Sequence, residues 1–262
     1  MALERQRLDG QVAIVTGAGR GVGRGIATVL AAAGATIVGA ARTQSELDIT
    51  VAAIERAGGK AISVVADVTR RADDERVVQT AIERFGRIDI LVNNAGGTHY
   101  KPFLEYTEEE FVDILYLNTV SAFMLSQLVA PHMIEVGQGS IVNISSGAGH
   151  IGIRGLVPYC AAKGGLDALT RAMAQELAPK IRVNAIALGS VLTPSAQKYA
   201  DATPGWTERL LSLTPLKREG DPEEIGLMTL YLCGRGCYAT SAIFNVDGGL
   251  QDTNFPVKLP DL

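Results

Sequence analysis

The sequence is poor in cysteine, histidine and aromatic residues. Its 262 residues include three cysteines, three histidines and one tryptophan. A small, odd number of cysteines argues against a disulfide framework, and three residues separate Cys233 from Cys237 instead of the two of a redox or zinc pair. The histidines, at 99, 132 and 150, lack the spacing of metal ligands. We therefore interpret the cysteines as structural and predict no metal site.

The sequence also lacks blocks of like charge and long apolar runs. Its formal net charge is −4, so electrostatics give nucleic-acid binding little support. No apolar run approaches 18 residues, which predicts no transmembrane helix. Residues 1–10 are charged and contain no apolar stretch, which argues against a signal peptide. These absences predict a cytoplasmic protein that does not attach to membranes.

Short apolar runs instead alternate with longer helical patterns along the whole chain. This alternation predicts βαβ units and a parallel sheet with covered faces. Strands are predicted over 11–16, 35–40, 61–66, 88–92, 139–144, 181–187 and 243–246, and helices over 22–34, 44–57, 71–85, 107–135, 156–178 and 221–233. We therefore predict one α/β domain over 1–262, a Rossmann-like doubly wound parallel sheet of about seven strands with helices on both faces.

Residues 189–220 interrupt this rhythm with three prolines and several glycines. A long irregular segment in a compact domain is commonly a lid or a binding loop. We predict a substrate loop here, and a plain surface insertion is the alternative.

The first predicted strand leads into the glycine-rich segment TGAGRGVG, residues 16–23. Glycines between a strand and a helix N-terminus let the backbone approach a pyrophosphate, and the helix end supplies free N–H groups. The spacing of Gly17, Gly21 and Gly23 differs from the common G-x-G-x-x-G pattern, and no Walker lysine follows. A nucleotide cofactor is the chemistry that this segment favours.

The end of the second strand indicates which nucleotide this is. A carboxylate at that point binds the ribose hydroxyls of NAD, whereas an arginine nearby accommodates the 2′-phosphate of NADP. The strand here ends in Ala40-Ala41-Arg42, without a carboxylate. The sequence therefore favours NADP, with NAD as the alternative.

Three further segments carry the remaining chemistry. NNAG (93–96) follows the fourth strand, Ser145 and Ser146 end the fifth, and Tyr159 and Lys163 lie four residues apart on a predicted helix. That spacing places both side chains on one helical face.

Taken together, these motifs resemble those of the short-chain dehydrogenase/reductase family, in their order and separation. TGAGRGVG resembles the cofactor motif, NNAG the structural motif and YCAAK (159–163) the active-site motif. The resemblance runs from about residue 8 to Gly249. It implies that Tyr159 is the general acid/base and that Lys163 binds the nicotinamide ribose and lowers the tyrosine pKa.

The resemblance also implies two polar helpers. Ser146 would hydrogen-bond the substrate oxygen, since its interval to Tyr159 fits the family better than that of Ser145, and alternation along a strand turns the two side chains opposite ways. Asn118 would hold a water for the proton relay. The implied cofactor contacts are Gly17, Arg20, Gly21, Val22, Gly23, Arg42, Asp67, Val68, Asn94, Ala95, Gly96, Tyr159, Lys163, Gly189, Val191 and Thr193. The family usually has proline where Leu188 stands.

The resemblance implies an oxidoreductase that interconverts a secondary alcohol and a ketone. Substrate contacts are expected from Ser146, Tyr159 and His150, although His150 and His99 are equally compatible with solvated loop positions. Apolar residues around the pocket favour an alicyclic or steroid-like compound, with a 3-oxoacyl thioester as the main alternative. A homotetramer is expected, with the tail 250–262 packed near a neighbouring subunit.

Two other functions compete with this one. A cofactor-binding sensor without turnover would not need both Tyr159 and Lys163. An epimerase or dehydratase of the extended branch would need a longer C-terminal substrate domain.

Overall fold

The computed structural model describes residues 3–250, whose seven strands form one parallel sheet of order β3-β2-β1-β4-β5-β6-β7. The strands are β1 (Val12–Thr16), β2 (Thr36–Ala41), β3 (Lys60–Val65), β4 (Ile90–Asn93), β5 (Gly139–Ser146), β6 (Ile181–Leu188) and β7 (Ile243–Val246). The predicted fold class is confirmed. Because the order reverses between β1 and β4, a crevice opens at their carboxyl ends, where ligands of such sheets bind.

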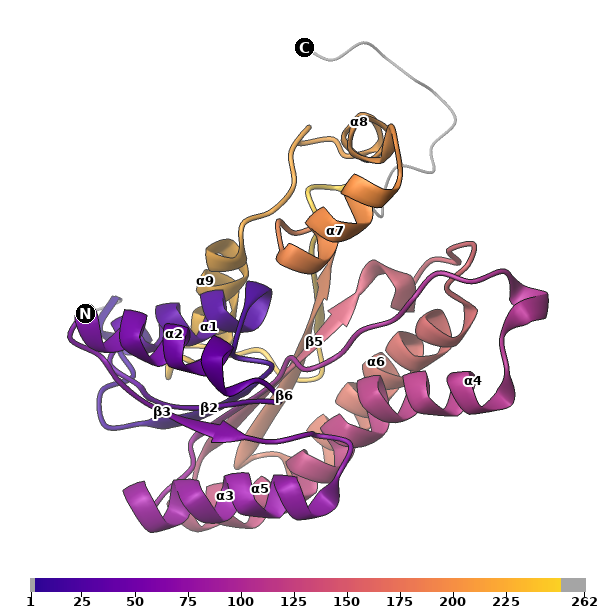
Figure 1. The fold of residues 1–262 in the computed structure, drawn as a ribbon. Coiled ribbons are helices and arrows are strands. Elements are labelled where there is room, and N and C mark those ends of the chain that lie inside the picture. The colour runs from indigo at the N-terminus through magenta and orange to yellow at the C-terminus, as the bar shows by residue number, and fades with distance from the viewer. Residues whose placement is uncertain (1–2, 251–262) are drawn as a thin grey trace.

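Helices cover both faces of the sheet (Figure 1). Helices α1 (Gly21–Ala32), α2 (Gln44–Arg56) and α9 (Pro222–Cys233) lie on one face, and α3 (Arg71–Phe85), α4 (Glu108–Leu115), α5 (Ser121–Val136) and α6 (Val157–Leu177) lie on the other. Short 3-10 turns occur at η1 (Leu3–Gln6), η2 (Phe103–Glu105) and η4 (Gly147–Gly149). The predicted helices match these bounds to within two residues, apart from the break that divides 107–135.

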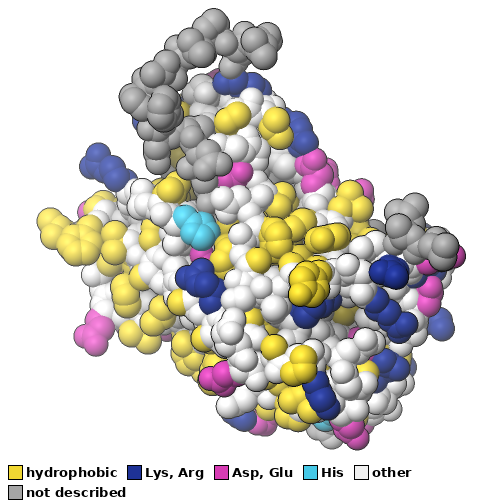
Figure 2. Space-filling model, turned by 180° about the vertical axis from the view of Figure 1, so that it is seen from behind, with side chains coloured by type: hydrophobic (Ala, Val, Ile, Leu, Met, Phe, Trp, Pro, Cys, Tyr) yellow, Lys and Arg dark blue, Asp and Glu magenta, His cyan; other side chains and the backbone are white. Residues whose placement is uncertain are grey.

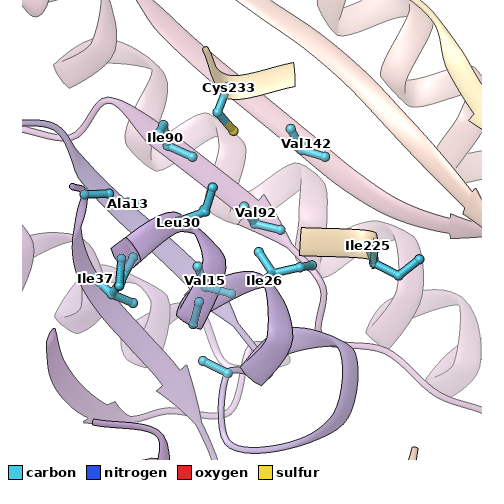
Figure 3. Packing of buried hydrophobic residues seen from close by; sticks show 14 of the residues in the cluster. Ala13, Val15, Ile26, Leu30, Ile37, Ile90, Val92, Val142, Ile225 and Cys233 are labelled. Carbon is cyan, nitrogen blue, oxygen red and sulfur yellow. The ribbon is translucent and has the colours of Figure 1, made fainter. Parts of the chain in front are cut away.

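Two apolar clusters fill the spaces between sheet and helices. Figure 3 shows part of the first, in which Ile26 and Leu30 of α1 and Ile225 of α9 meet Val15 and Val92 of the sheet. Strands buried on both faces carry apolar residues in succession, as β1 does with four apolar residues before Thr16 and all five of its residues buried. This packing holds the β1–α1 turn at the carboxyl ends of the strands.

The helical stretch Glu108–Val136 is interrupted by a π-helical turn, η3 (Tyr116–Val120). By length and composition alone this stretch could cross a membrane, since it has 29 residues and a mean hydropathy of 1.4. The prediction that no segment of the chain is long and apolar enough to span a membrane was therefore wrong. In the fold, 44% of its apolar window is buried, and its helices pack against α3 and α6. That packing explains its apolar character.

The prediction of an irregular segment over 189–220 was also wrong, because it contains α7 (Pro194–Ala202) and α8 (Trp206–Leu213). Thr193 caps α7 by accepting a hydrogen bond from the Ala196 N–H at 3.1 Å, and Pro194 occupies its first turn. The tail was predicted to pack near a neighbouring subunit, and its residues from 251 onward lie outside the part of the chain that the structure describes.

Candidate active site

A cavity of about 480 Å³ opens at the carboxyl edge of the sheet, beside the β1–β4 crevice. Every residue that the sequence assigned to cofactor binding lines it, from Gly17 in the β1–α1 turn to Thr193 after β6. Ser146, Tyr159 and Lys163 line the same cavity. The fold thus brings the predicted cofactor and catalytic residues together.

The glycine-rich turn fits a phosphate group. In the described chain no side chain caps α1 and its first turn has no acidic residue, so the first N–H groups of the helix remain available to an anion in the cavity that this turn lines. The glycines are required by close packing, since a Cβ at Gly23 would lie 2.2 Å from the Gly17 carbonyl oxygen and one at Gly96 2.7 Å from Asn118 Oδ1. These residues therefore suit a dinucleotide cofactor.

Thr16 and Asn94 brace this turn against β4. The Asn94 side-chain amide donates to the Thr16 carbonyl at 2.8 Å, and Thr16 Oγ1 accepts the N–H groups of Asn94 and Ala95 at 3.0 and 2.9 Å. These bonds connect the carboxyl ends of β1 and β4 at the base of the cavity. The sequence analysis did not single out Thr16, although it is the first residue of the quoted cofactor motif.

Two arginines line the same cavity. Arg20 pairs with Glu46 of α2 at 3.1 Å. Arg42 is exposed, makes no ion pair within 4 Å among the described residues, and lies near enough to Asp67 for the two charges to attract. Glu46 was another residue that sequence reasoning missed, and its position in α2 carried no motif that could have revealed it.

Tyr159 and Lys163 lie on consecutive turns of α6. Lys163 is 4% exposed and donates from Nζ to the Ile144 carbonyl at 2.8 Å. The same nitrogen lies 5.5 Å from the centre of the Tyr159 ring. Ser146, at the end of β5, accepts the Ala148 N–H at 3.2 Å, and Ser145 is buried. Both serines line the cavity, and the choice of Ser146 as the substrate contact stays a prediction.

The expected depression of the tyrosine pKa does not arise from the protein groups alone. Burial raises the pKa of Tyr159 to about 12, while a hydrogen bond with Ser146 acts against this rise. Burial also lowers the pKa of Lys163 to about 8, opposed by the charge of Asp167. The phenol is therefore protonated near neutral pH, as a proton donor to a carbonyl oxygen must be.

Asn118 lies in the π-helical turn and is 2% exposed. Its side-chain amide donates to the carbonyls of Gly97 and Ile114, each at 2.8 Å, and its Oδ1 accepts the Gly97 N–H at 3.1 Å. It thereby clamps the segment after NNAG. The structure does not test its predicted hold on a water.

The two histidines near the site point to protein partners. His150 Nε2 lies 3.5 Å from Asp167 Oδ2, and His99 Nε2 lies 3.4 Å from Glu110 Oε1. Within the described chain neither histidine is part of the cavity lining. A direct substrate contact of His150 stays a prediction.

Residues 11–204 match the family model described as short chain dehydrogenase. The chain belongs to the short-chain dehydrogenase/reductase family. It is 40% identical over 264 residues to an uncharacterized oxidoreductase from Mycobacterium tuberculosis, and the alignment covers 100% of both chains. It is therefore an oxidoreductase of this family, and a nicotinamide dinucleotide is its cofactor.

Two further relatives have named activities. The chain is 37% identical over 246 residues to a 3-oxoacyl-(acyl-carrier-protein) reductase from Thermotoga maritima, covering 93% of this chain and 99% of the relative. A solved 7α-hydroxysteroid dehydrogenase, complexed with NADH and 7-oxo glycochenodeoxycholic acid, superposes with a TM-score of 0.91 at 37% identity over 96% of this chain and 99% of the other.

Proposed function

We propose that this protein interconverts a secondary alcohol and a ketone, with Tyr159 as general acid/base. The observation that carries the proposal is the convergence of Ser146, Tyr159 and Lys163 in a cavity whose floor is a phosphate-binding turn. Bound there, a nicotinamide dinucleotide supplies or accepts the hydride.

The chain's own residues would handle the proton. Ser146 holds the substrate oxygen and Tyr159 donates its phenolic proton to that oxygen during reduction. The ammonium of Lys163 then stabilises the phenolate left behind, because opposite charges at short range in a buried site attract strongly. Lys163 is fixed for this task by its bond to the Ile144 carbonyl.

Replacing the phenol tests this assignment. Tyr159→Phe should lower kcat for ketone reduction by about 10³-fold, within the usual range for a lost general acid, and leave the Kd of the reduced cofactor unchanged. Tyr231→Phe is the matched control, since Tyr231 is exposed on α9 outside the cavity lining. Turnover of Tyr159→Phe at the unsubstituted rate would overturn the role given to this tyrosine.

We propose NADP as the preferred cofactor, with NAD as the alternative. Arg20 and Arg42 both line the cavity, and the nearby β2 end offers two alanines where a carboxylate would repel a 2′-phosphate. An exposed guanidinium can bind such a phosphate through two parallel hydrogen bonds.

Affinity measurements decide between the two cofactors. The Kd for NADPH should be at least about tenfold lower than that for NADH, and Arg42→Ala should remove most of this difference, as expected for a lost hydrogen bond to a charged group. Arg56→Ala, at the other end of α2, is the control because it leaves the cavity lining intact. A tighter NADH complex in the unsubstituted protein would reject NADP.

An alicyclic or steroid-like ketone is the substrate class that we propose. Tyr100 and Trp206 meet edge to face, with ring centres 6.2 Å apart, and Tyr100 lies close enough to Tyr159 to help raise the pKa of that phenol. Leu192 and Leu213 add exposed apolar surface on the segment 189–220. Flat aromatic and aliphatic side chains suit the faces of fused rings.

A 3-oxoacyl thioester is the alternative substrate, favoured by the likeness to the reductase from Thermotoga maritima. A panel of cyclic ketones, steroid ketones and 3-oxoacyl thioesters, each with NADPH and NADH, separates the two classes. Higher kcat/KM on the thioesters would reject the cyclic substrate.

We further propose a cytoplasmic homotetramer in which residues 1–262 act as one domain, with Ser146, Tyr159 and His150 contacting the substrate. Three unpaired cysteines support the reducing compartment. Exposed apolar side chains on α4 and α5, among them Phe111, Val112 and Phe123, support assembly.

A further inference from the structure

A carboxyl group is buried behind the active site, on the helix that carries the catalytic pair. Asp167 follows Lys163 by four residues and Tyr159 by eight, so the three side chains follow one stripe of α6. Asp167 is 2% exposed, and neither of its oxygens has a hydrogen bond of ordinary geometry among the described residues, although the Ser145 hydroxyl lies close enough to lower its pKa. A buried polar group left in this state is costly and calls for a specific reason.

Four polar or charged groups face this carboxyl. They are Ser145 of β5, Lys163 and Arg171 of α6, and His150, which follows the η4 turn. The Lys163 ammonium is directed at the Ile144 carbonyl. His150 presents Nε2 to Asp167 Oδ2 at 3.5 Å, and its side chain remains 35% exposed at the surface. Burial raises the pKa of Asp167, and all four groups oppose that rise.

The η4 turn is packed tightly onto this part of α6. A Cβ at Gly149 would lie 2.6 Å from Asp167 Oδ2 and 3.1 Å from the Lys163 carbonyl oxygen. The turn begins directly after Ser146, whose Oγ accepts the Ala148 N–H. Asp167 therefore lies beneath the short segment that joins Ser146 to His150.

We propose that Asp167 is a positioning residue that accepts a hydrogen bond from His150 Nε2. The bond would hold the η4 turn, and with it Ser146, against the helix that carries Tyr159 and Lys163. It would also leave Nδ1 as the atom through which His150 reaches the substrate. This inference rests on the proposed function for the role of Ser146, whereas the contact itself does not depend on turnover.

Nitrogen NMR of the histidine side chains tests the contact without any substrate. The chain has three histidines, so long-range proton–nitrogen spectra of ¹⁵N-histidine protein are simple, and His150→Gln identifies the His150 signals. At neutral pH Nε2 of His150 should carry a proton and should change environment in Asp167→Asn. An unprotonated Nε2, with the proton on Nδ1, would overturn the proposal, because Nε2 could then not donate a hydrogen bond to Asp167.

Steady-state kinetics test the positioning role. With a ketone from the substrate panel, Asp167→Asn and His150→Gln should each lower kcat/KM about tenfold, mainly through a higher KM, as expected for a lost hydrogen bond to a charged group. The Kd for NADPH should stay within twofold. The double variant should be no worse than His150→Gln alone, because Asp167 acts on the substrate site only through His150.

Asp74→Asn is the matched control for this experiment. Asp74 is also buried and without hydrogen-bond partners in the described chain, but it lies on α3 outside the cavity lining. Its replacement should leave KM unchanged. An unchanged KM in His150→Gln, or effects that add in the double variant, would overturn the proposal. Should Asp167→Asn fail to fold, the protonation of His150 Nε2 in the unsubstituted protein decides. Failure of every ketone would reject the proposed function, while the NMR result still stands.

Discussion

At the scale of single residues, Asp74 presents the clearest link between burial and charge. Its side chain, on the first turn of α3, is fully buried and has no hydrogen-bond partner among residues 3–250. Burial, with help from the charges of Asp73 and Asp67, raises the pKa of Asp74 to about 7. The folded protein therefore binds this proton more tightly than the unfolded chain, where the ordinary value is 3.8.

This difference predicts a pH-dependent stability. The contribution of protonated Asp74 is fully present below pH 4 and is lost as the pH rises to 7, since ionising the folded form leaves a charge buried. Asp74→Asn should therefore flatten the decline in unfolding free energy between pH 5 and pH 8, by at most about 3 kcal/mol. Urea unfolding at both pH values measures this. Equal pH slopes in the two proteins would contradict the raised pKa.

Tyr159 shows at the same scale what the sequence could and could not predict. Its partners Lys163 and Ser146 were identified from motifs. The direction of its pKa was not, because burial of the phenol outweighs the groups that favour the phenolate. A spacing rule identifies which side chains meet, whereas the solvent exposure that sets a pKa depends on the whole fold.

At the scale of elements, α1 and α9 approach closely through glycines. A Cβ at Gly25 would lie 2.6 Å from the backbone of Pro222, and one at Gly226 would lie 2.9 Å from the Gly25 carbonyl oxygen. This contact holds α1, and thus the glycine-rich turn before it, against the start of α9.

Adding one methyl group at this contact should be destabilising. Gly25→Ala should lower the unfolding free energy by about 1–3 kcal/mol, since backbone atoms on both sides cannot move easily. Gly165→Ala in α6 is the control, because its Cβ would meet Thr119 at an ordinary 3.6 Å and should gain from helix propensity. Thermal unfolding measures both, and a Gly25→Ala protein as stable as the control would refute the tight contact.

The segment 189–220 illustrates how elements can be missed. Its prolines suggested irregular chain, yet Pro194 lies in the first turn of a helix, after the capping residue Thr193. Proline is favoured at that position because its missing N–H would be unsatisfied anyway. The helix-start signal was present in the sequence, and the density of prolines outweighed it.

At the scale of the whole molecule, exposed apolar surface remains after folding. Figure 2 shows one face, on which hydrophobic side chains lie between charged ones. Phe111, Val112, Phe123 and Ile134 of α4 and α5 are each more than a third exposed. Large aromatic and aliphatic side chains on neighbouring helices are typical of contact surfaces between subunits.

Light scattering coupled to size exclusion tests the assembly. At micromolar concentration the protein should elute with about four times the chain mass of 27.6 kDa, and Phe123→Glu should reduce that mass because it buries a charge in the contact. Ile49→Glu, on the exposed side of α2, is the control. Elution of the unsubstituted protein as a monomer would reject the tetramer.

The sequence by itself determined the order of strands and helices along the chain, the glycine-rich turn after β1 and the pair Tyr159 and Lys163, because each depends on local spacing or on a short motif. Only the tertiary structure placed Asp167 beside His150, clamped Gly97 with Asn118 and paired Arg20 with Glu46. Residues from separate elements make each of these contacts. These contacts form only when the sheet and its helices pack together. The local periodicity of the sequence does not indicate which distant side chains that packing brings into contact.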